Sequence, residues 1–251
     1  MKKKPVSNNL LIAAAVVLVI VVVAFLFFNG PKTTAANVLI IGSPSQTLLD
    51  TLASEDFKIA GVTVTKVVSD SQVTAKDLDG ANLVIMQGEE YCDNTLRLYL
   101  NKAGPNLLIV GNACSRSQYR SSIGFNALLW EQEFAGHVDR ALELSDAPLA
   151  SNDLSGKFVI DSAYHQLFSG ILNYGFSGEV TVFKPHRSFV IASICDENDS
   201  NYDLSCEGVP AIVEMQTAPS ALYFAFDPST TSRNLFFNAM KYASQARQFG
   251  T

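Results

Sequence analysis

Histidine, tryptophan and clustered basic residues are scarce in this chain of 251 residues, which has three histidines and one tryptophan. The histidines (His137, His165 and His186) are too scattered to have the spacing of metal ligands. Neither an HExxH motif nor a paired CxxC motif occurs, and the turn GSPSQ lacks the glycine repeat and the Lys-Ser/Thr pair of a phosphate loop. The sequence therefore predicts no metal site and no cofactor.

Positive charge is also sparse once Lys2, Lys3 and Lys4 at the N-terminus are set aside. The rest of the chain has 15 basic and 24 acidic residues, which is a formal charge of about −9. A protein that binds nucleic acid through the phosphate backbone needs clustered lysine and arginine side chains. We therefore expect no nucleic-acid partner.

One long apolar run is present, and it lies at the N-terminus. Residues 10–28 are nineteen consecutive apolar residues, and as a helix they would span about 28 Å, close to the roughly 30 Å of a hydrocarbon core. The three lysines precede this run and only Lys32 follows it closely, so the positive-inside rule places residues 1–9 in the cytoplasm. A cleaved signal peptide is the alternative, although its apolar region is usually shorter.

These features predict a single-pass protein of the cell membrane that is held in the lipid bilayer by residues 10–28. Residues 1–9 would be a cytoplasmic tail, residues 29–36 a linker, and residues 37–251 one exterior domain. All four cysteines fall in this exterior part. An even number of cysteines in an oxidising compartment favours two disulfide bonds.

The first half of the exterior domain alternates between strand-like and helix-like runs. Apolar and β-branched residues predict strands at 38–41, 62–68 and 82–86, and a fourth strand that runs into a turn within 106–118, with helices within 42–55 and 95–104. The segment TAKDLDGA is expected to be a connection only. Strands that alternate with helices in this way predict right-handed βαβ units and a doubly wound, mainly parallel α/β sheet.

The second half is less regular. An amphipathic region near 122–143 precedes five strand candidates, and several of these are close enough in sequence to pair antiparallel; they are KFVID, EVTVFKP, SFVIASI, PAIVEMQ and ALYFAFD. A closing helix is expected within 230–247, where a Thr or Ser cap precedes a broad apolar face.

Five segments carry a resemblance to a known family: ANLVIMQG, NLLIVGNACS, AYHQLFSGI, PAIVEMQTAPSALYFAFDPS and NLFFNAMKYA. In this order, between Asn37 and Tyr242, they resemble the class I glutamine amidotransferase-like superfamily. This is a flavodoxin-like α/β fold, and the likeness is strongest to its non-amidotransferase branches, which include ThuA-like and membrane-associated domains. The resemblance implies an amidotransferase-like exterior domain with antiparallel additions in its second half.

The resemblance allows a test of Cys114, because active members of the family carry a nucleophilic cysteine after this strand. They place a glycine two residues before the cysteine and another two residues after it, whereas here Gly111 is three before and Arg116 is two after. Their catalytic histidine precedes a proline after the last strand, where this chain has Asp227. An aspartate is far too weak a base to deprotonate a thiol. Glutamine hydrolysis is not expected, and Cys114 remains only a candidate nucleophile.

The disulfide pairing follows from two different arguments. Cys195 and Cys206 flank the ten-residue polar loop DENDSNYDLS, which a disulfide would close. Cys92 follows the third strand and Cys114 the fourth, and the resemblance implies that these strands are neighbours, so the two cysteines would meet.

Ligands of open α/β folds bind at the carboxyl edge of the sheet, where the strands end. The candidate ligand-binding residues at this edge are Ser43, Gly88, Glu89, Asn112, Ser115, Arg116 and Asp227. Glycines and small polar residues let backbone N–H groups approach a ligand, and Arg116 could hold an anion. The alternative is that all of these are ordinary loop residues.

Together these features predict a membrane-anchored exterior domain without amidotransferase activity. Its expected role is a non-catalytic binding or scaffold module of the cell envelope, whose partner is another envelope protein or a glycan. Two alternatives stay open: a thiol-dependent hydrolase that uses Cys114, and a carbohydrate-binding ThuA-like protein.

Overall fold

The structure is a computed structural model that describes residues 36–101, 105–117, 151–161, 166–181, 189–199, 208–215 and 221–245, together with Tyr202 and Cys206. The predicted membrane span and the amphipathic region near 122–143 lie outside these residues. Within the described ranges, no helix combines the length and the apolar character needed to cross a bilayer.

Nine strands form one sheet in the order β2-β1-β3-β4-β9-β8-β7-β5-β6. Its first half is parallel and consists of β1 (Ala36–Gly42), β2 (Val62–Val68), β3 (Leu83–Gln87), β4 (Asn106–Val110) and β9 (Ala221–Phe224). All residues of β3, β4 and β9 are buried, as expected for strands covered on both faces.

The second half of the sheet is antiparallel and consists of β5 (Ser151–Ile160), β6 (Gly175–Thr181), β7 (Phe189–Asp196) and β8 (Val209–Met215), which joins β9. Four strand pairs are parallel and four are antiparallel. The predicted mainly parallel sheet is therefore wrong, and the sheet is mixed. The physical reason lies in the length of the connections. The segment between Met215, where β8 ends, and Ala221, where β9 begins, is too short for a parallel crossover but sufficient for a hairpin.

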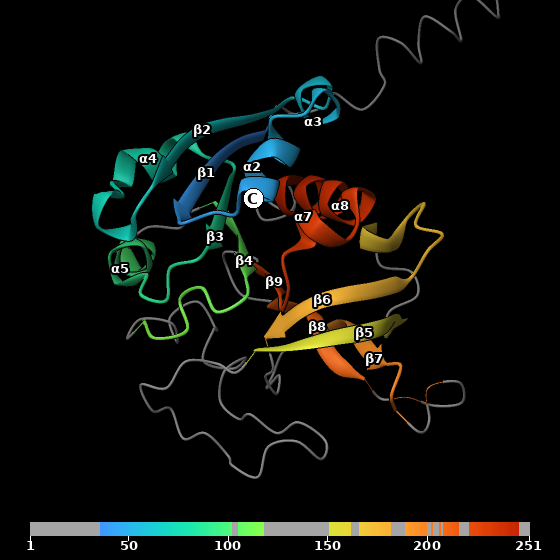
Figure 1. The fold of residues 1–251 in the computed structure, drawn as a ribbon. Coiled ribbons are helices and arrows are strands. Elements are labelled where there is room, and N and C mark those ends of the chain that lie inside the picture. Colours follow the sequence, from blue (N-terminus) through green and yellow to red (C-terminus); the bar gives the residue numbers. More distant parts are fainter. Residues whose placement is uncertain are drawn as a thin grey trace, which may run out of the picture. The chain divides into compact units, whose positions relative to one another are not determined.

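Helices flank the parallel half. Helix α8 (Arg233–Gln245) packs against β3, β4 and β9, and α7 (Pro228–Thr231) contacts both α8 and α2 (Gln46–Leu52). Figure 1 shows these three helices together on one side of the strands, with α4 (Ala75–Gly80) and α5 (Asp93–Asn101) on the other. The short helix α3 (Glu55–Ile59) contributes Phe57, whose ring lies 5.5 Å from that of Phe236 and 5.3 Å from that of Phe237.

One helical prediction needs correction and another is confirmed. The segment expected to be a connection contains α4, because Thr74 and Asp77 form a capping box that satisfies the free N–H groups of its first turn. The closing helix expected within 230–247 is α8, and Ser232 Oγ accepts from the Leu235 N–H at its start. The short helix α7 precedes it and was not predicted.

Candidate functional site

The carboxyl ends of β1, β3, β4 and β9 meet at one edge of the sheet, because these strands are parallel neighbours. A pocket of about 470 Å³ opens there, which we call the edge pocket. It is lined by the turns after the parallel strands and by the end of β6; the lining residues are Ser43, Ser45, Gln87, Gly88, Val110, Gly111, Asn112, Glu179, Thr181, Ala225, Phe226, Asp227 and Thr230.

Two glycines allow the turns after β1 and β3 to approach each other. Gly42 has a φ of 104° and Gly88 a φ of 70°, backbone conformations that side chains disfavour. A Cβ on Gly42 would lie 2.2 Å from the Gln87 carbonyl oxygen, and one on Gly88 would lie 2.4 Å from that of Ser43. The edge pocket therefore depends on glycine at both positions, and Gly88 was predicted as a site residue.

Asp227 connects three of the elements around the edge pocket. Its Oδ2 accepts hydrogen bonds from Ser45 Oγ at 2.6 Å and from Gln87 Nε2 at 2.9 Å. Its Oδ1 accepts from the backbone N–H of Ser229 at 2.9 Å and from Ser229 Oγ at 2.6 Å, so that Asp227 is also the N-cap of α7. Four donors occupy the accepting positions of this carboxylate, which is held between the ends of β1, β3 and β9.

Gln87 and Ser45 complete this network. The Gln87 Oε1 accepts a hydrogen bond from the Ser45 N–H at 3.0 Å, and Ser45 Oγ accepts from the Leu48 N–H at 3.1 Å as the N-cap of α2. Gln87 was not among the predicted site residues. The sequence feature that could have identified it is its position: Gln87 is the polar residue that ends the otherwise apolar strand LVIMQ.

Cys114 has the backbone of an elbow but not a free thiol. With a φ of 60° it is the single non-glycine residue in the left-handed region among those described, and its N–H donates to the Glu89 carbonyl oxygen at 2.7 Å. Its sulfur is bonded to that of Cys92, with 5.0 Å between the Cα atoms, and both cysteines are fully buried. The pairing expected from the resemblance is therefore the one present, and the sulfur lies against Met86 Sδ at 3.2 Å.

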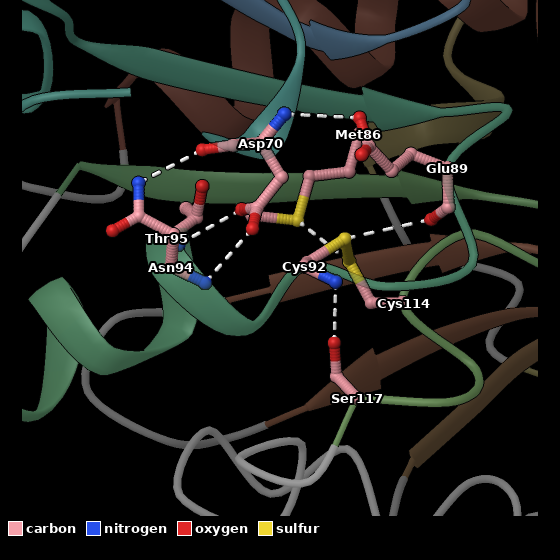
Figure 2. The surroundings of a disulfide bond; sticks show 8 residues. All are labelled: Asp70, Met86, Glu89, Cys92, Asn94, Thr95, Cys114 and Ser117. Carbon is pink, nitrogen blue, oxygen red and sulfur yellow. Dashed lines mark hydrogen bonds between the residues drawn. A yellow bond between two sulfur atoms is a disulfide. The ribbon is translucent and has the colours of Figure 1, made fainter. Parts of the chain in front are cut away.

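Asp70 fixes the start of α5, next to Cys92. Its buried carboxylate accepts hydrogen bonds from the backbone N–H groups of Asn94 and Thr95, both at 2.8 Å. Figure 2 shows these bonds beside the disulfide, together with the bond from the Cys92 N–H to Ser117 Oγ. The Ser117 end of the turn at 111–117 is thus tied to the segment before α5.

The remaining predicted residues divide into two groups. Ser43 and Asn112 line the edge pocket, as do Gly88 and Asp227. Glu89, Ser115 and Arg116 are not among its described lining residues.

Contacts explain the position of two of these residues. Arg116 forms an ion pair with Glu90, Nε to Oε2, at 3.0 Å, and Asn112 Nδ2 donates to Glu90 Oε1 at 3.2 Å. Glu89 Oε2 accepts from the Asp70 N–H at 3.0 Å. The positive charge that was suggested for an anion is therefore already paired with a carboxylate.

Thr181 is a buried polar residue of the edge pocket that the sequence did not single out. Tyr223 is fully buried, and burial raises the pKa of its hydroxyl, an effect that Thr181 partly offsets. The tyrosine therefore stays neutral.

The second cysteine pair closes the loop after β7. Cys195 and Cys206 are bonded, with 5.8 Å between their Cα atoms, which agrees with the pairing expected from the sequence. The three histidines, His137, His165 and His186, lie outside the described residues. In the described part of the chain, no group of three or more His, Cys, Asp or Glu side chains is arranged to hold a metal ion.

No protein-family model and no curated protein matches the chain. Among solved structures, the cytoplasmic protein STM3548 from Salmonella typhimurium is similar, with a TM-score of 0.52 at 12% identity over 82% of this chain and 98% of that chain. The cytoplasmic protein STM1381 from Salmonella typhimurium LT2 also has a TM-score of 0.52, at 13% identity over 82% of this chain and 99% of that chain.

A third similar structure is the glutaminase domain of the Trypanosoma brucei CTPS with bound acivicin. Its TM-score is 0.47 at 12% identity, over 82% of this chain and 94% of that chain. At such identities the likeness concerns the fold alone. The described domain is an α/β protein with a mixed nine-stranded sheet, and it shares this fold with the two Salmonella proteins.

Proposed function

We propose that this chain is a non-catalytic, ligand-binding domain of glutamine amidotransferase-like fold, held on the outer side of a membrane by residues 10–28. Its binding site is the edge pocket. The observation that carries the proposal is the buried disulfide of Cys114, because it removes the thiolate that an elbow nucleophile needs.

The position and the hydrogen bonds of Asp227 also argue against thiol catalysis. It occupies the position where the resemblance implies a catalytic histidine, and its carboxylate is bound by four hydrogen-bond donors that belong to the protein. A carboxylate held in this way is a structural link between strand ends. It has no spare accepting position for a proton of a substrate or a nucleophile.

The amidotransferase-like assignment rests on the arrangement of elements around the edge pocket. The parallel strands end together there, and the residue after β4 at the elbow position has positive φ. Ligands of open α/β sheets bind at this edge. The likeness to solved structures supports the general fold.

The exterior location is supported by the cysteines. All four are paired in two disulfides, and disulfides persist in oxidising compartments but are rare in the cytosol. This agrees with the long apolar run and the charge distribution at the N-terminus.

Counting free thiols tests the non-catalytic assignment directly. The full-length chain, purified without reductant and treated with iodoacetamide, should show no alkylated cysteine by mass spectrometry, either folded or unfolded in urea. Alkylation of Cys114 in either state would contradict the assignment and favour a thiol hydrolase.

A ligand screen tests the edge pocket. We expect compounds from a library of polar metabolites and glycans to raise the melting temperature of the full-length chain. The exposed Ser43 lines the pocket, so Ser43→Trp should abolish this rise by filling it. Thr63→Trp, on the exposed side of β2, is the matched control and should keep the rise. A rise that Ser43→Trp leaves unchanged would place the ligand elsewhere, and the absence of any rise would count against a binding function.

A further inference from the structure

The described lining of the edge pocket carries negative charge. Two carboxylates line it, those of Asp227 and Glu179. Asp227 is saturated by hydrogen bonds from the protein, as described above. Glu179 lies exposed on β6, and within the described chain it has no ion-pair partner. It is thus the charged group of the described lining that remains open to a ligand.

The register of β5 and β6 places a second carboxylate next to Glu179. Asp153 is its direct partner in the antiparallel pair, and both residues are exposed. Directly opposed residues of an antiparallel pair point to the same face of the sheet, and like charges in this arrangement are destabilising. A cation bound at Glu179 would relieve this repulsion, so the fold itself favours a positively charged ligand there.

Neutral polar groups also line the pocket. Gln87 Nε2 keeps one hydrogen beyond its bond to Asp227, and Asn112 donates to Glu90 through Nδ2, which leaves its Oδ1 as an acceptor. Ser43 adds an exposed hydroxyl. These groups can donate to and accept from hydroxyl or amide groups of a small molecule.

On this basis, and resting on the proposed function of the edge pocket, we propose that its ligand is a small hydroxylated primary amine. The protonated amine lies on the Glu179 carboxylate, and the hydroxyl groups of the ligand are bound by Gln87, Asn112 and Ser43. Glu179 is the residue that determines specificity for the amine. The volume of about 470 Å³ is large enough for a molecule the size of an amino sugar.

Matched pairs of ligands that differ in the amine test this proposal. We would titrate the full-length chain in non-ionic detergent, by calorimetry at low ionic strength, with D-glucosamine against D-glucose and with serinol against glycerol. A charge-assisted hydrogen bond should make the hydroxylated amines bind about tenfold or more tightly than their neutral partners. The preference should shrink as salt is added, because salt screens the charges.

Substitutions test whether the preference for the amine depends on the Glu179 carboxylate. Glu179→Gln should abolish the preference for the amine and raise the melting temperature of the unliganded chain, because it removes the repulsion from Asp153. Glu197→Gln, at an exposed position beyond the end of β7, is the control. It should change neither the preference for the amine nor the melting temperature of the unliganded chain. A preference that survives in Glu179→Gln would overturn the role of Glu179.

The outcomes also separate this inference from the proposed function. If the amines and their neutral partners bind equally, or if no amine binds, the amine inference is overturned. The ligand screen with Ser43→Trp then decides independently whether the edge pocket binds other compounds.

Discussion

The role of Asp227 is clear only from its hydrogen bonds in the structure. In the sequence it is an aspartate where the resembled family has a histidine, and this indicates only that a base is missing. In the structure the same carboxylate joins the ends of three strands through Ser45, Gln87 and Ser229. Its role is therefore to hold the floor of the edge pocket in place.

We expect Asp227→Ala to destabilise the domain by about 2–4 kcal/mol, because it removes an N-cap and leaves the donors of Ser45 and Gln87 without their acceptor. Urea unfolding followed by circular dichroism measures this change. Asp50→Ala removes an exposed carboxylate that accepts one hydrogen bond from Gln46, and it should cost about 0.5 kcal/mol or less. Equal effects of the two substitutions would contradict the role of Asp227.

Glycine substitutions test the close approach of the turns after β1 and β3. Gly88→Ala should cost about 2 kcal/mol or more, because φ is 70° and the new Cβ would lie 2.4 Å from the Ser43 carbonyl oxygen. Gly80→Ala is the matched control: it lies in α4 with no atom within 4 Å of the new Cβ, and it should stabilise by up to about 1 kcal/mol. Thermal unfolding should therefore show a lower melting temperature for Gly88→Ala and a higher one for Gly80→Ala than for the wild-type chain.

At the scale of elements, the turn at 111–117 and the start of α5 act as one unit. The disulfide joins them covalently, the N–H groups of Cys114 and Arg116 donate to the carbonyl oxygens of Glu89 and Glu90, and Asp70 caps α5 from the other side. Gly111 and Asn112 of this turn line the edge pocket. The cysteine that resembles a nucleophile therefore anchors a wall of the pocket.

Removing this disulfide should destabilise the chain substantially. The cross-link closes a loop with a sequence separation of 22, for which the loop-entropy model gives about 3 kcal/mol. We expect the double substitution Cys92→Ala with Cys114→Ala to lower the free energy of unfolding by at least this amount. The pair Cys195→Ala with Cys206→Ala, with a separation of 11, should cost less. A larger loss for the second pair in urea unfolding would contradict the anchoring role of the first.

The capping box of α4 predicts a dependence of stability on pH. The hydrogen bond from Thr74 lowers the pKa of Asp77 below its ordinary value of 3.8, and Lys66, 3.0 Å from Oδ1, lowers it further. Because the pKa is lower in the folded state, the stabilisation is fully present above the unfolded value and is lost as the pH falls through the folded value.

Asp77→Asn should therefore be less stable than the wild-type chain at pH 7, and the difference should disappear towards pH 2. Urea unfolding across this range measures it. Thr74→Ala should weaken the same dependence, whereas Thr74→Ser keeps the hydroxyl and should preserve it. A difference that persists unchanged at pH 2 would contradict this explanation.

At the scale of the molecule, the edge pocket requires both halves of the sheet. The turns after the parallel strands form its floor, while Glu179 and Thr181 come from β6 in the antiparallel half. The backbone N–H of Thr181 donates to the Ala225 carbonyl oxygen just after β9, at 2.6 Å, and this bond brings the end of β6 to the pocket. A sheet without its antiparallel half would not contain this wall.

Membrane attachment is also tested on the whole chain. Inserted into sealed vesicles, the full-length protein should resist extraction by alkaline carbonate. In right-side-out vesicles, added protease should digest the domain of residues 37–251. Replacing Lys2, Lys3 and Lys4 with glutamate removes the charge bias and should reduce the fraction in this orientation. Release of the unmodified chain by carbonate would contradict the anchor.

Much of the local structure was predictable from the sequence. The strand at 62–68 has the predicted bounds, the strands predicted at 38–41 and 82–86 differ by one or two residues at their ends, and the fourth strand begins at Asn106 as predicted. Both cysteine pairs were also expected, although the Cys92 pairing depended on a strand order taken from the resemblance. These features follow from runs of apolar or β-branched residues and from short loops, which are properties of neighbouring residues.

What only the tertiary structure decided is the sheet order of the second half and the composition of the edge pocket. Gln87 and Asp227 are 140 residues apart, and Ser45 and Asp227 are 182 apart. Glu179 reaches the pocket because the end of β6, the last strand of the sheet, is hydrogen-bonded through the Thr181 N–H to the Ala225 carbonyl oxygen just after β9. Local patterns encode which residues form strands and turns, whereas contacts between distant residues depend on which strands pair, and that is set by the packing of the whole domain.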